Sequence, residues 1–261
     1  MKKLAITSIA TLALASFVAL PAFAVQLASD SFSYPDGNLV PNGGWANYSG
    51  ANIDIQIASG RATGGAIGNP ANDDHLLFAV QPTTSKTYAC FDVKIPAFAG
   101  QPKPIYFAEL KDNGSTLLVS RVYVLPLAAG GWTFGISHSS TSTTVGVTPW
   151  TSALNSDQIY NVVINYDPVN HSSTLWVNPS SELSPSVTNT NAAQAAVAVQ
   201  GFGLRQSNAA ATLPASPAYT GTADWNFSVD NLGVGTTFSD ACFQAVPTKA
   251  NTWGQVKTLY R

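Results

Sequence analysis

The sequence predicts an all-β protein, an antiparallel β-sandwich of about twelve strands. Three observations lead to this prediction. Short segments in which apolar and polar residues alternate recur roughly every 8–15 residues. Turn dipeptides such as Asn113-Gly114 and Gly130-Gly131 separate them, and helical periodicity is almost absent. We expect one domain with no internal boundary.

The clearest element is a hairpin over residues 160–179. Val162, Ile164 and Tyr166 fall on one face of its first strand, and a turn rich in Asp, Pro and Asn follows. Alternation resumes in the second strand, residues 174–178. A two-residue period on both sides of a turn predicts two paired strands.

Similar patterns predict the other strands. In the strand at 86–95, Tyr88 and Cys90 lie on one face, and Ala89, Phe91 and Val93 on the other. Loops are predicted at 39–49, 64–74 and 208–221, and residues 191–199 as one or two helical turns. The remaining strands are predicted at 28–34, 53–57, 61–63, 75–80, 105–110, 116–125, 132–138, 143–147, 201–206 and 225–238.

The N-terminal segment predicts export. Lys2 and Lys3 precede an apolar stretch, residues 4–20, and Ala22-Phe23-Ala24 has the pattern of a cleavage site. We therefore interpret residues 1–24 as a signal peptide, with an N-terminal membrane anchor as the alternative. The protein would then be periplasmic, on the cell surface or extracellular. No other apolar run is long enough to predict a membrane span.

The charge pattern excludes some partners. Without Lys2 and Lys3 the chain has 10 basic and 14 acidic side chains, a net charge near −4. No basic cluster is present, so nucleic acid is not a predicted partner. A hydrophobic content of 45% is ample for the core of one large domain.

Cys90 and Cys242 are the two cysteines of the chain. Because an exported chain meets an oxidising compartment, we predict that they form a disulfide. Two free buried thiols are the alternative.

Two segments carry a resemblance to known proteins. The hairpin YNVVINYDPVNHSSTLWVNP and the later SVDNLGVGTTFSD resemble the concanavalin A-like lectin/glucanase superfamily, and more closely the laminin-G-like domains of secreted bacterial proteins. The resemblance implies a concanavalin A-like jelly roll over residues 25–244. It indicates the fold rather than an activity, because the superfamily includes lectins, adhesion modules and hydrolases.

The resemblance also implies a structural calcium ion. Asp230 matches a position at which related sandwiches place a calcium-ligating carboxylate on the last strand, and Asp30 would supply a further oxygen. Asp36 and Asp224 are additional candidates. The alternative is that Asp230 accepts hydrogen bonds from neighbouring backbone amides.

Aromatic residues near predicted loops are candidate ligand contacts. Trp45, Tyr48, Trp132 and Trp150 could stack on sugar rings, as aromatic side chains do in shallow binding grooves. Packing in the core is the alternative for each.

No catalytic residue is predicted. Glu109 and Asp112 are three residues apart, so on a strand they point to opposite faces and cannot form the carboxylate pair of a glycosidase. Asp73-Asp74 is interpreted as part of a solvated loop. The histidines His75, His138 and His171 are assigned to strand ends and a turn.

The C-terminal residues 245–261 differ in character from the rest, and a sorting or anchoring signal and an ordinary tail are both open. The leading hypothesis for function is a secreted, calcium-stabilised, non-catalytic module that binds carbohydrate or another cell-surface component. A divergent glycan hydrolase or lyase is one alternative. A self-associating extracellular structural protein, held together by its strand edges, is the other.

Overall fold

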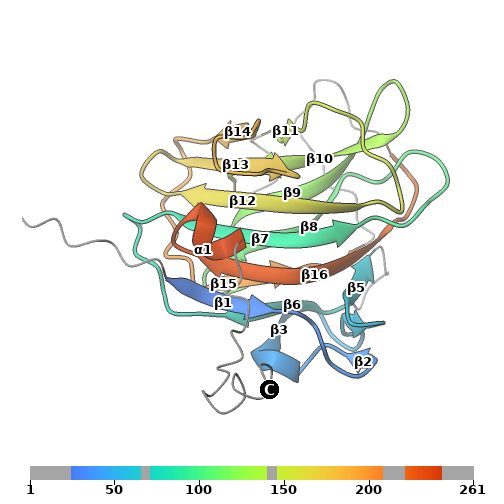
Figure 1. Ribbon diagram of the computed structural model, residues 1–261, viewed down its shortest axis with the longest axis horizontal. Helices are drawn as coiled ribbons and strands as arrows, with labels where there is room; N and C mark the ends of the chain where they lie inside the picture. The colour runs from blue at the N-terminus through green and yellow to red at the C-terminus, as the bar shows by residue number, and fades with distance from the viewer. Residues whose placement is uncertain (1–24, 66–70, 140–145, 208–220, 243–261) are drawn as a thin grey trace, which may run out of the picture.

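The computed structural model describes residues 25–65, 71–139, 146–207 and 221–242, which form two antiparallel sheets packed face to face (Figure 1). This confirms the predicted all-β sandwich. The described residues contain sixteen strands, more than the predicted twelve or so. The additional strands are mostly short, and sequence alternation does not reveal strands of two to four residues.

The larger sheet has nine strands and faces the viewer in Figure 1. The short helix α1 (Phe238–Cys242) packs on its outer face, against β7 and β16. In spatial order the strands are β14 (Val187–Thr190), β13 (Ser172–Val177), β12 (Ile159–Asp167), β7 (Thr87–Lys94), β16 (Asn226–Gly235), β5 (Ala62–Gly65), β4 (Gln56–Ile57) and β2 (Gly37–Asn38), with β1 (Gln26–Asp30) also paired to β16.

The smaller sheet has seven strands and lies behind the first in Figure 1. It has one face toward the core and the other away from it. Its order is β11 (Thr148–Pro149), β10 (Trp132–Ser137), β9 (Leu118–Pro126), β8 (Ile105–Lys111), β15 (Gly201–Leu204), β6 (Asp73–Leu77) and β3 (Trp45–Ser49).

The core lies between the sheets and is aromatic. Phe91 of β7 contacts Phe107 and Phe202 of the seven-stranded sheet, with ring centroids 6.4 and 5.4 Å apart. The predicted faces of β7 are confirmed, because Ala89, Phe91 and Val93 belong to this core. Tyr88 and Cys90 belong to a second cluster on the outer face, under α1.

Some predicted elements differ from the structure. The predicted loop at 39–49 contains β3, because its residues pair with β6. Asp73 and Asp74, predicted in a solvated loop, are buried residues of β6. The helical turns predicted at 191–199 do not form. The predicted strand at 143–147 and loop at 208–221 fall mostly outside the described residues. The predicted signal peptide at 1–24 and C-terminal tail at 245–261 lie entirely outside them. Among the described residues, no helix has both the length and the apolar character needed to cross a membrane.

Candidate functional site

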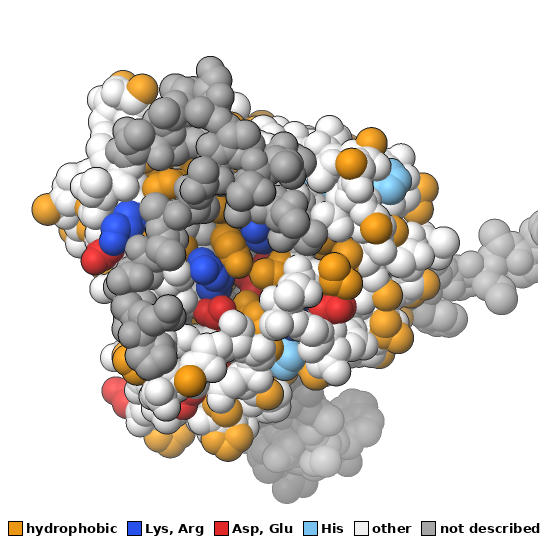
Figure 2. Space-filling model, turned by 180° about the vertical axis from the view of Figure 1, so that it is seen from behind, with side chains coloured by type: hydrophobic (Ala, Val, Ile, Leu, Met, Phe, Trp, Pro, Cys, Tyr) orange, Lys and Arg blue, Asp and Glu red, His pale blue; other side chains and the backbone are white. Residues whose placement is uncertain are grey.

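The outer face of the seven-stranded sheet carries an unusual group of charged and aromatic side chains. In β8 and β9 the residues Phe107, Leu110 and Val122 belong to the core between the sheets, whereas Glu109, Lys111 and Arg121 do not. Figure 2 views the molecule from this side and shows basic and acidic side chains gathered at the middle of the face. The polar cluster is the group of neighbouring side chains on this sheet formed by Tyr48, Asp73, His75, Tyr106, Glu109, Lys111, Arg121, Tyr123 and Arg205, many of which are buried.

One half of the polar cluster is built around Tyr48. Its ring stacks on His75 with centroids 5.3 Å apart, and Lys111 Nζ lies 4.3 Å from the ring centre. The Tyr48 hydroxyl donates a hydrogen bond to the carboxylate of Glu109. Lys111 Nζ lies 3.0 Å from His75 Nδ1, and burial together with Lys111 lowers the pKa of His75 to about 4. His75 is therefore neutral near pH 7, and its Nδ1 accepts from Lys111.

The other half is built around two arginines. The guanidinium of Arg121 lies 5.0 Å from the ring centre of Tyr106 and 5.7 Å from that of Tyr123. Arg205 lies 4.3 Å from the Tyr106 ring, and its Nε is 3.9 Å from Asp73 Oδ2. Cation–π contacts hold both guanidinium groups in place without neutralising their charge.

Several polar atoms of the cluster have no hydrogen-bond partner among the residues that the structure describes. Arg121 is 2% exposed and Glu109 is 0% exposed. Yet Nε and one terminal nitrogen of Arg121, Oε2 of Glu109 and the hydroxyl of Tyr123 lack any hydrogen bond within the described part of the chain. A buried polar group without a partner costs about 1–3 kcal/mol, and more when it is charged. Buried polar groups without hydrogen bonds indicate that a ligand, an ion or water forms the missing hydrogen bonds.

The acidic side chains of the polar cluster do not neutralise all of its basic side chains. Three basic side chains of the cluster face two acidic ones. Burial raises the pKa of Asp73 to about 7, with Arg205 opposing the shift and Glu109 adding to it. Burial also raises the pKa of Glu109, against the opposing effects of the Tyr48 hydroxyl and of Arg205. Near pH 7 Asp73 is therefore partly protonated and offsets less than one positive charge, whereas burial lowers the pKa of Lys111 against the opposing effect of Glu109.

Glycine makes room for this arrangement. In β15, Phe202 and Leu204 point into the core, whereas Gly201 and Gly203 face the polar cluster. A Cβ atom at Gly203 would lie 2.3 Å from Glu109 Oε1. Any other residue at this position would displace the carboxylate.

The four aromatic candidates are not brought together. Tyr48 belongs to the polar cluster. Trp45 and Trp132 are only 2% and 3% exposed and belong to the core, with their indole nitrogens donating to Asp30 and Ser156. Their rings are not accessible to a sugar in this structure, which corrects the expectation that they lie near the surface. Trp150 is half-buried and packs on the same core.

The two calcium candidates have protein partners instead. Asp30 accepts hydrogen bonds from the backbone of Phe32 and from the side chains of Tyr34 and Trp45. Asp230 pairs with Arg61, 3.1 Å away, and accepts from the backbone amide of Asn231. Among the described residues no group of three or more His, Cys, Asp or Glu side chains could hold a metal. A cation would have to displace these donors, so the contacts do not fit a calcium site.

Cys90 and Cys242 are adjacent in the structure. Both are free thiols, and Cys242 of α1 is within hydrogen-bonding reach of Cys90 in β7. This hydrogen bond and burial raise the pKa of Cys242. The disulfide itself stays a prediction.

Two further histidines and Glu182 have structural partners. His138 stacks on Tyr166 with centroids 5.4 Å apart and bonds Ser173. His171 contacts the carbonyl of Gln194, and Glu182 accepts from Tyr88.

Sequence reasoning missed the polar cluster, apart from Tyr48. One signal was available: Arg121 interrupts the apolar segment LLVSRVYVL, in which a charge must be buried or serve a purpose. Glu109 and Lys111 lie two residues apart and therefore share a face of β8.

Comparison with known proteins supports the fold. No family model and no curated protein matches the chain. A sialidase structure is similar over 83% of this chain with a TM-score of 0.53 and 14% identity, but the chain spans only 19% of the sialidase. An alginate lyase structure is similar over 80% of this chain and 96% of its own, with a TM-score of 0.51 and 13% identity. A mutant of that lyase in complex with an alginate trisaccharide gives a TM-score of 0.53 at 12% identity. At these identities the likeness shows the jelly-roll sandwich alone, and the laminin-G-like assignment stays a prediction.

Proposed function

We propose that this protein binds an acidic polysaccharide on the outer face of its seven-stranded sheet and does so without cleaving it. The observation that carries the proposal is the buried guanidinium of Arg121, of which Nε and one terminal nitrogen lack a hydrogen-bond partner among the described residues. A buried unpaired charge is strongly destabilising, so a ligand that pairs with it gains that energy on binding.

A sugar carboxylate suits this site. The planar guanidinium offers two parallel donors that match a carboxylate, and both Arg205 and Lys111 contribute positive charge nearby. The rings of Tyr106 and Tyr123 flank the guanidinium and could pack against a sugar ring. The likeness in fold to an alginate lyase and to its complex with an alginate trisaccharide supports a polysaccharide rather than a small anion.

Binding at this face must be coupled to its opening. Glu109, Lys111 and Tyr123 are all fully buried, so a polysaccharide cannot reach them in the conformation described. The apparent affinity is then reduced by the fraction of molecules in the open conformation.

Export, the signal peptide and the laminin-G-like character remain part of this proposal. They would place the protein where it meets extracellular polysaccharides. Structural calcium remains part of the sequence-based prediction, although the contacts of Asp30 and Asp230 argue against it.

Affinity electrophoresis tests the proposal. The full chain would be run through gels that contain polygalacturonate, its methyl ester or a neutral glucan, each with calcium and with chelator. We expect retardation by polygalacturonate alone, since the methyl ester lacks the charge that Arg121 would pair with. Equal retardation by the ester would contradict the proposal. Absence of binding together with concentration-dependent assembly would favour the self-associating structural protein.

A lyase is the second candidate, favoured by the buried and unpartnered hydroxyl of Tyr123 beside Arg121. In a β-elimination a base removes the proton next to the carboxylate, the glycosidic C–O bond breaks, and the leaving oxygen takes up a proton. Arg121 would stabilise the negative charge that develops on the carboxylate. Burial raises the pKa of Tyr123, so its hydroxyl stays protonated and could donate to the leaving oxygen. His75, which is neutral near pH 7, could accept the proton removed.

The same samples distinguish the two candidates. An unsaturated sugar end absorbs ultraviolet light, and a bound polysaccharide without such an increase in absorbance supports binding alone. A steady increase that is lost in Tyr123→Phe would establish the lyase and overturn the non-catalytic proposal.

A further inference from the structure

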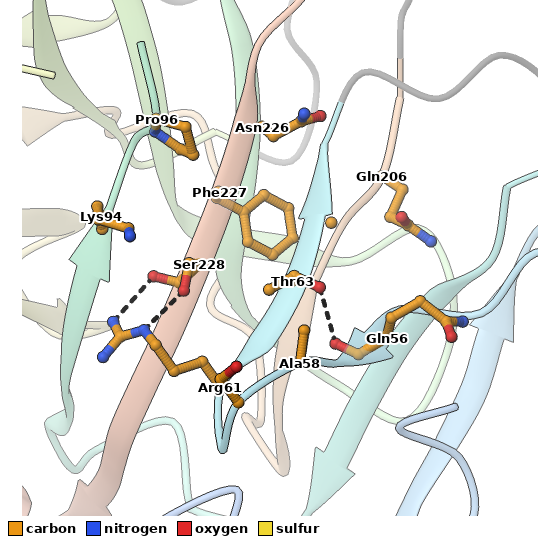
Figure 3. Close-up of a pocket in the computed structure, with 12 residues that line it drawn as sticks. Gln56, Ala58, Arg61, Thr63, Lys94, Pro96, Gln206, Asn226, Phe227 and Ser228 are labelled. Carbon is orange, nitrogen blue, oxygen red and sulfur yellow. Dashed lines mark hydrogen bonds between the residues drawn. The ribbon is translucent and has the colours of Figure 1, made fainter. Parts of the chain in front are cut away.

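The nine-stranded sheet carries a separate cleft on its outer face. None of the described residues that line it belongs to the polar cluster, although the backbone amide of its lining residue Gln206 donates to Asp73 of that cluster. The cleft has a volume of about 480 Å³, within the range of small-molecule sites. It crosses β7, β16, β5 and β4 where these strands lie side by side (Figure 3). We call it the second cleft.

A row of polar side chains forms the wall of the second cleft. Lys94 is the register partner of Ser228, Ser228 that of Thr63, and Thr63 that of Gln56. Directly paired residues on neighbouring strands point to the same side, and the strands are about 4.8 Å apart. The row therefore extends for roughly 14 Å, three strand spacings, which suits an extended ligand.

Pro96 gives the second cleft an apolar surface. Phe227 lies beside the cleft as well, but its side chain is 0% exposed and its ring packs in the core, with its centroid 5.5 Å from that of Phe107. Hydroxyl and amide groups beside an apolar surface match a sugar, which presents both hydroxyl groups and C–H faces.

The charge of the second cleft is positive. Arg61 lies along one side, where it donates to Ser228 Oγ at 2.6 Å and pairs with Asp230 (Figure 3). Lys94 takes part in none of the ion pairs of the described residues. No acidic side chain is among the described residues that line the cleft. Asp92 lies two residues before Lys94 on the same face of β7, but its carboxylate accepts hydrogen bonds from Asn161 and Asn231. Lys94 is therefore the cation of the cleft that an anionic group on a ligand would meet.

An unpaired buried acceptor gives independent support. Gln206 lines the second cleft and is 4% exposed. Its Nε2 donates to the carbonyls of Ile53 and Asn72, at 3.0 and 3.2 Å, but its Oε1 has no partner among the described residues. A hydroxyl group of a ligand could donate the missing hydrogen bond to Gln206 Oε1.

We propose that the second cleft binds another segment of the acidic polysaccharide, which makes the protein bivalent. This inference rests on the proposed function for the class of ligand, but it uses none of the same residues. Two sites on opposite faces of one domain would let a long chain occupy both, or let one protein join two chains.

Isothermal titration with a short galacturonate oligosaccharide tests the inference through stoichiometry. We expect two molecules bound per wild-type chain, one in Lys94→Ala/Gln56→Ala, one in Arg121→Met and none in the combined variant. Thr63→Trp, which fills the second cleft and keeps its charge, should also leave one. Lys86→Ala is the matched control, because Lys86 pairs with Asp167 away from the cleft, and it should keep two.

Each proposal can fail separately in this experiment. Two sites retained in Lys94→Ala/Gln56→Ala and in Thr63→Trp would overturn the second cleft. A single wild-type site that only Arg121→Met abolishes would do the same and leave the proposed function standing. A single site abolished only by the cleft variants would overturn the proposed function and keep the second cleft. Absence of binding in the wild type would overturn both.

Discussion

The outer faces of the two sheets differ in whether their arginine side chains have hydrogen-bond and ion-pair partners. On the nine-stranded sheet Arg61 is partly exposed and has Asp230 and Ser228 as partners. On the seven-stranded sheet Arg121 is buried, its flanking tyrosines do not neutralise it, and two of its nitrogens have no partner within the described residues. Partly exposed ion pairs are an ordinary feature that contributes little to stability.

A buried cation without a partner has no such ordinary explanation. It makes the folded state less stable than an apolar residue of the same size would. Its retention is therefore better explained by function than by folding. The difference between Arg61 and Arg121 shows how a binding site can be recognised. The number of charges on a face says less about binding than whether each charged group has a hydrogen-bond or ion-pair partner within the protein.

The largest expected effect concerns the nine-stranded side. Oxidation should join Cys90 and Cys242, and in the chain-entropy model closing so long a loop stabilises the fold by about 5 kcal/mol. Thermal melting of oxidised and reduced protein would measure the change, while binding of polygalacturonate should be unaffected. Cys90→Ala is the control and should not respond to oxidant. Two reactive thiols in protein isolated from an oxidising compartment would contradict the prediction.

The next effect concerns the seven-stranded side. Arg121→Met should weaken binding of polygalacturonate by about 30-fold or more, since losing one partner of a buried charge pair costs about 2–5 kcal/mol. The free protein should melt at the same or a higher temperature, because two buried guanidinium nitrogens that have no partner among the described residues are removed. Lys86→Met serves as the comparison, because Lys86 pairs with Asp167 outside both sites. It should leave this binding unchanged, and a fall in melting temperature for Arg121→Met would mean that Arg121 has a structural role instead.

A smaller effect is expected at Gly203. Gly203→Ala places a Cβ atom against the Glu109 carboxylate and should destabilise the fold by about 1–3 kcal/mol, with a parallel loss of binding. Gly146→Ala is the matched control, because no atom of the described residues lies within 4 Å of its added Cβ. Urea denaturation compares the stability of Gly203→Ala with that of Gly146→Ala. Equal urea midpoints for the two variants would contradict a need for free space at Gly203.

The smallest effect is a pH dependence. Burial raises the pKa of Asp73 from 3.8 to about 7. Between about pH 4 and about pH 7 the folded state therefore holds a proton on Asp73 that the unfolded state has released. The contribution of Asp73 to stability therefore falls as the pH rises from about 4 to about 7. Lowered pKa values of His75 and His138, both about 4, oppose this trend over much of the same range.

A variant separates these opposing contributions. Asp73→Asn should gain stability relative to the wild type as the pH rises from 4 to 7, and the exposed Asp36→Asn should not. Melting temperatures across this range would measure the difference. A constant difference between Asp73→Asn and the wild type would contradict the raised pKa.

Much of the fold could be predicted from the sequence. The two faces of β7 and of β12 followed from alternation, because a strand with one face in the core must repeat every two residues. Trp45 was misplaced in a loop, because β3 depends on its pairing with β6 and carries little alternation of its own.

The candidate sites could be predicted far less. Alternation shows that Glu109 and Lys111 share a face, but not that the face is closed to solvent or that Arg121 from β9 lies across it. The register that aligns Lys94, Ser228 and Thr63 joins residues more than 100 positions apart, and local sequence does not contain it. Asp230 matched a calcium position in the resemblance, but the distant Arg61 occupies its carboxylate instead.

The most direct test is an isothermal titration of the full chain with a galacturonate oligosaccharide and with the same oligosaccharide after its carboxyl groups are reduced to alcohols. If the unpaired charge of Arg121 draws the ligand, the acidic form should bind at least tenfold more tightly, a difference of about 1.4 kcal/mol. The preference should be smaller in Arg121→Met. Equal affinities for the two forms in the wild type would contradict an acidic polysaccharide as the ligand.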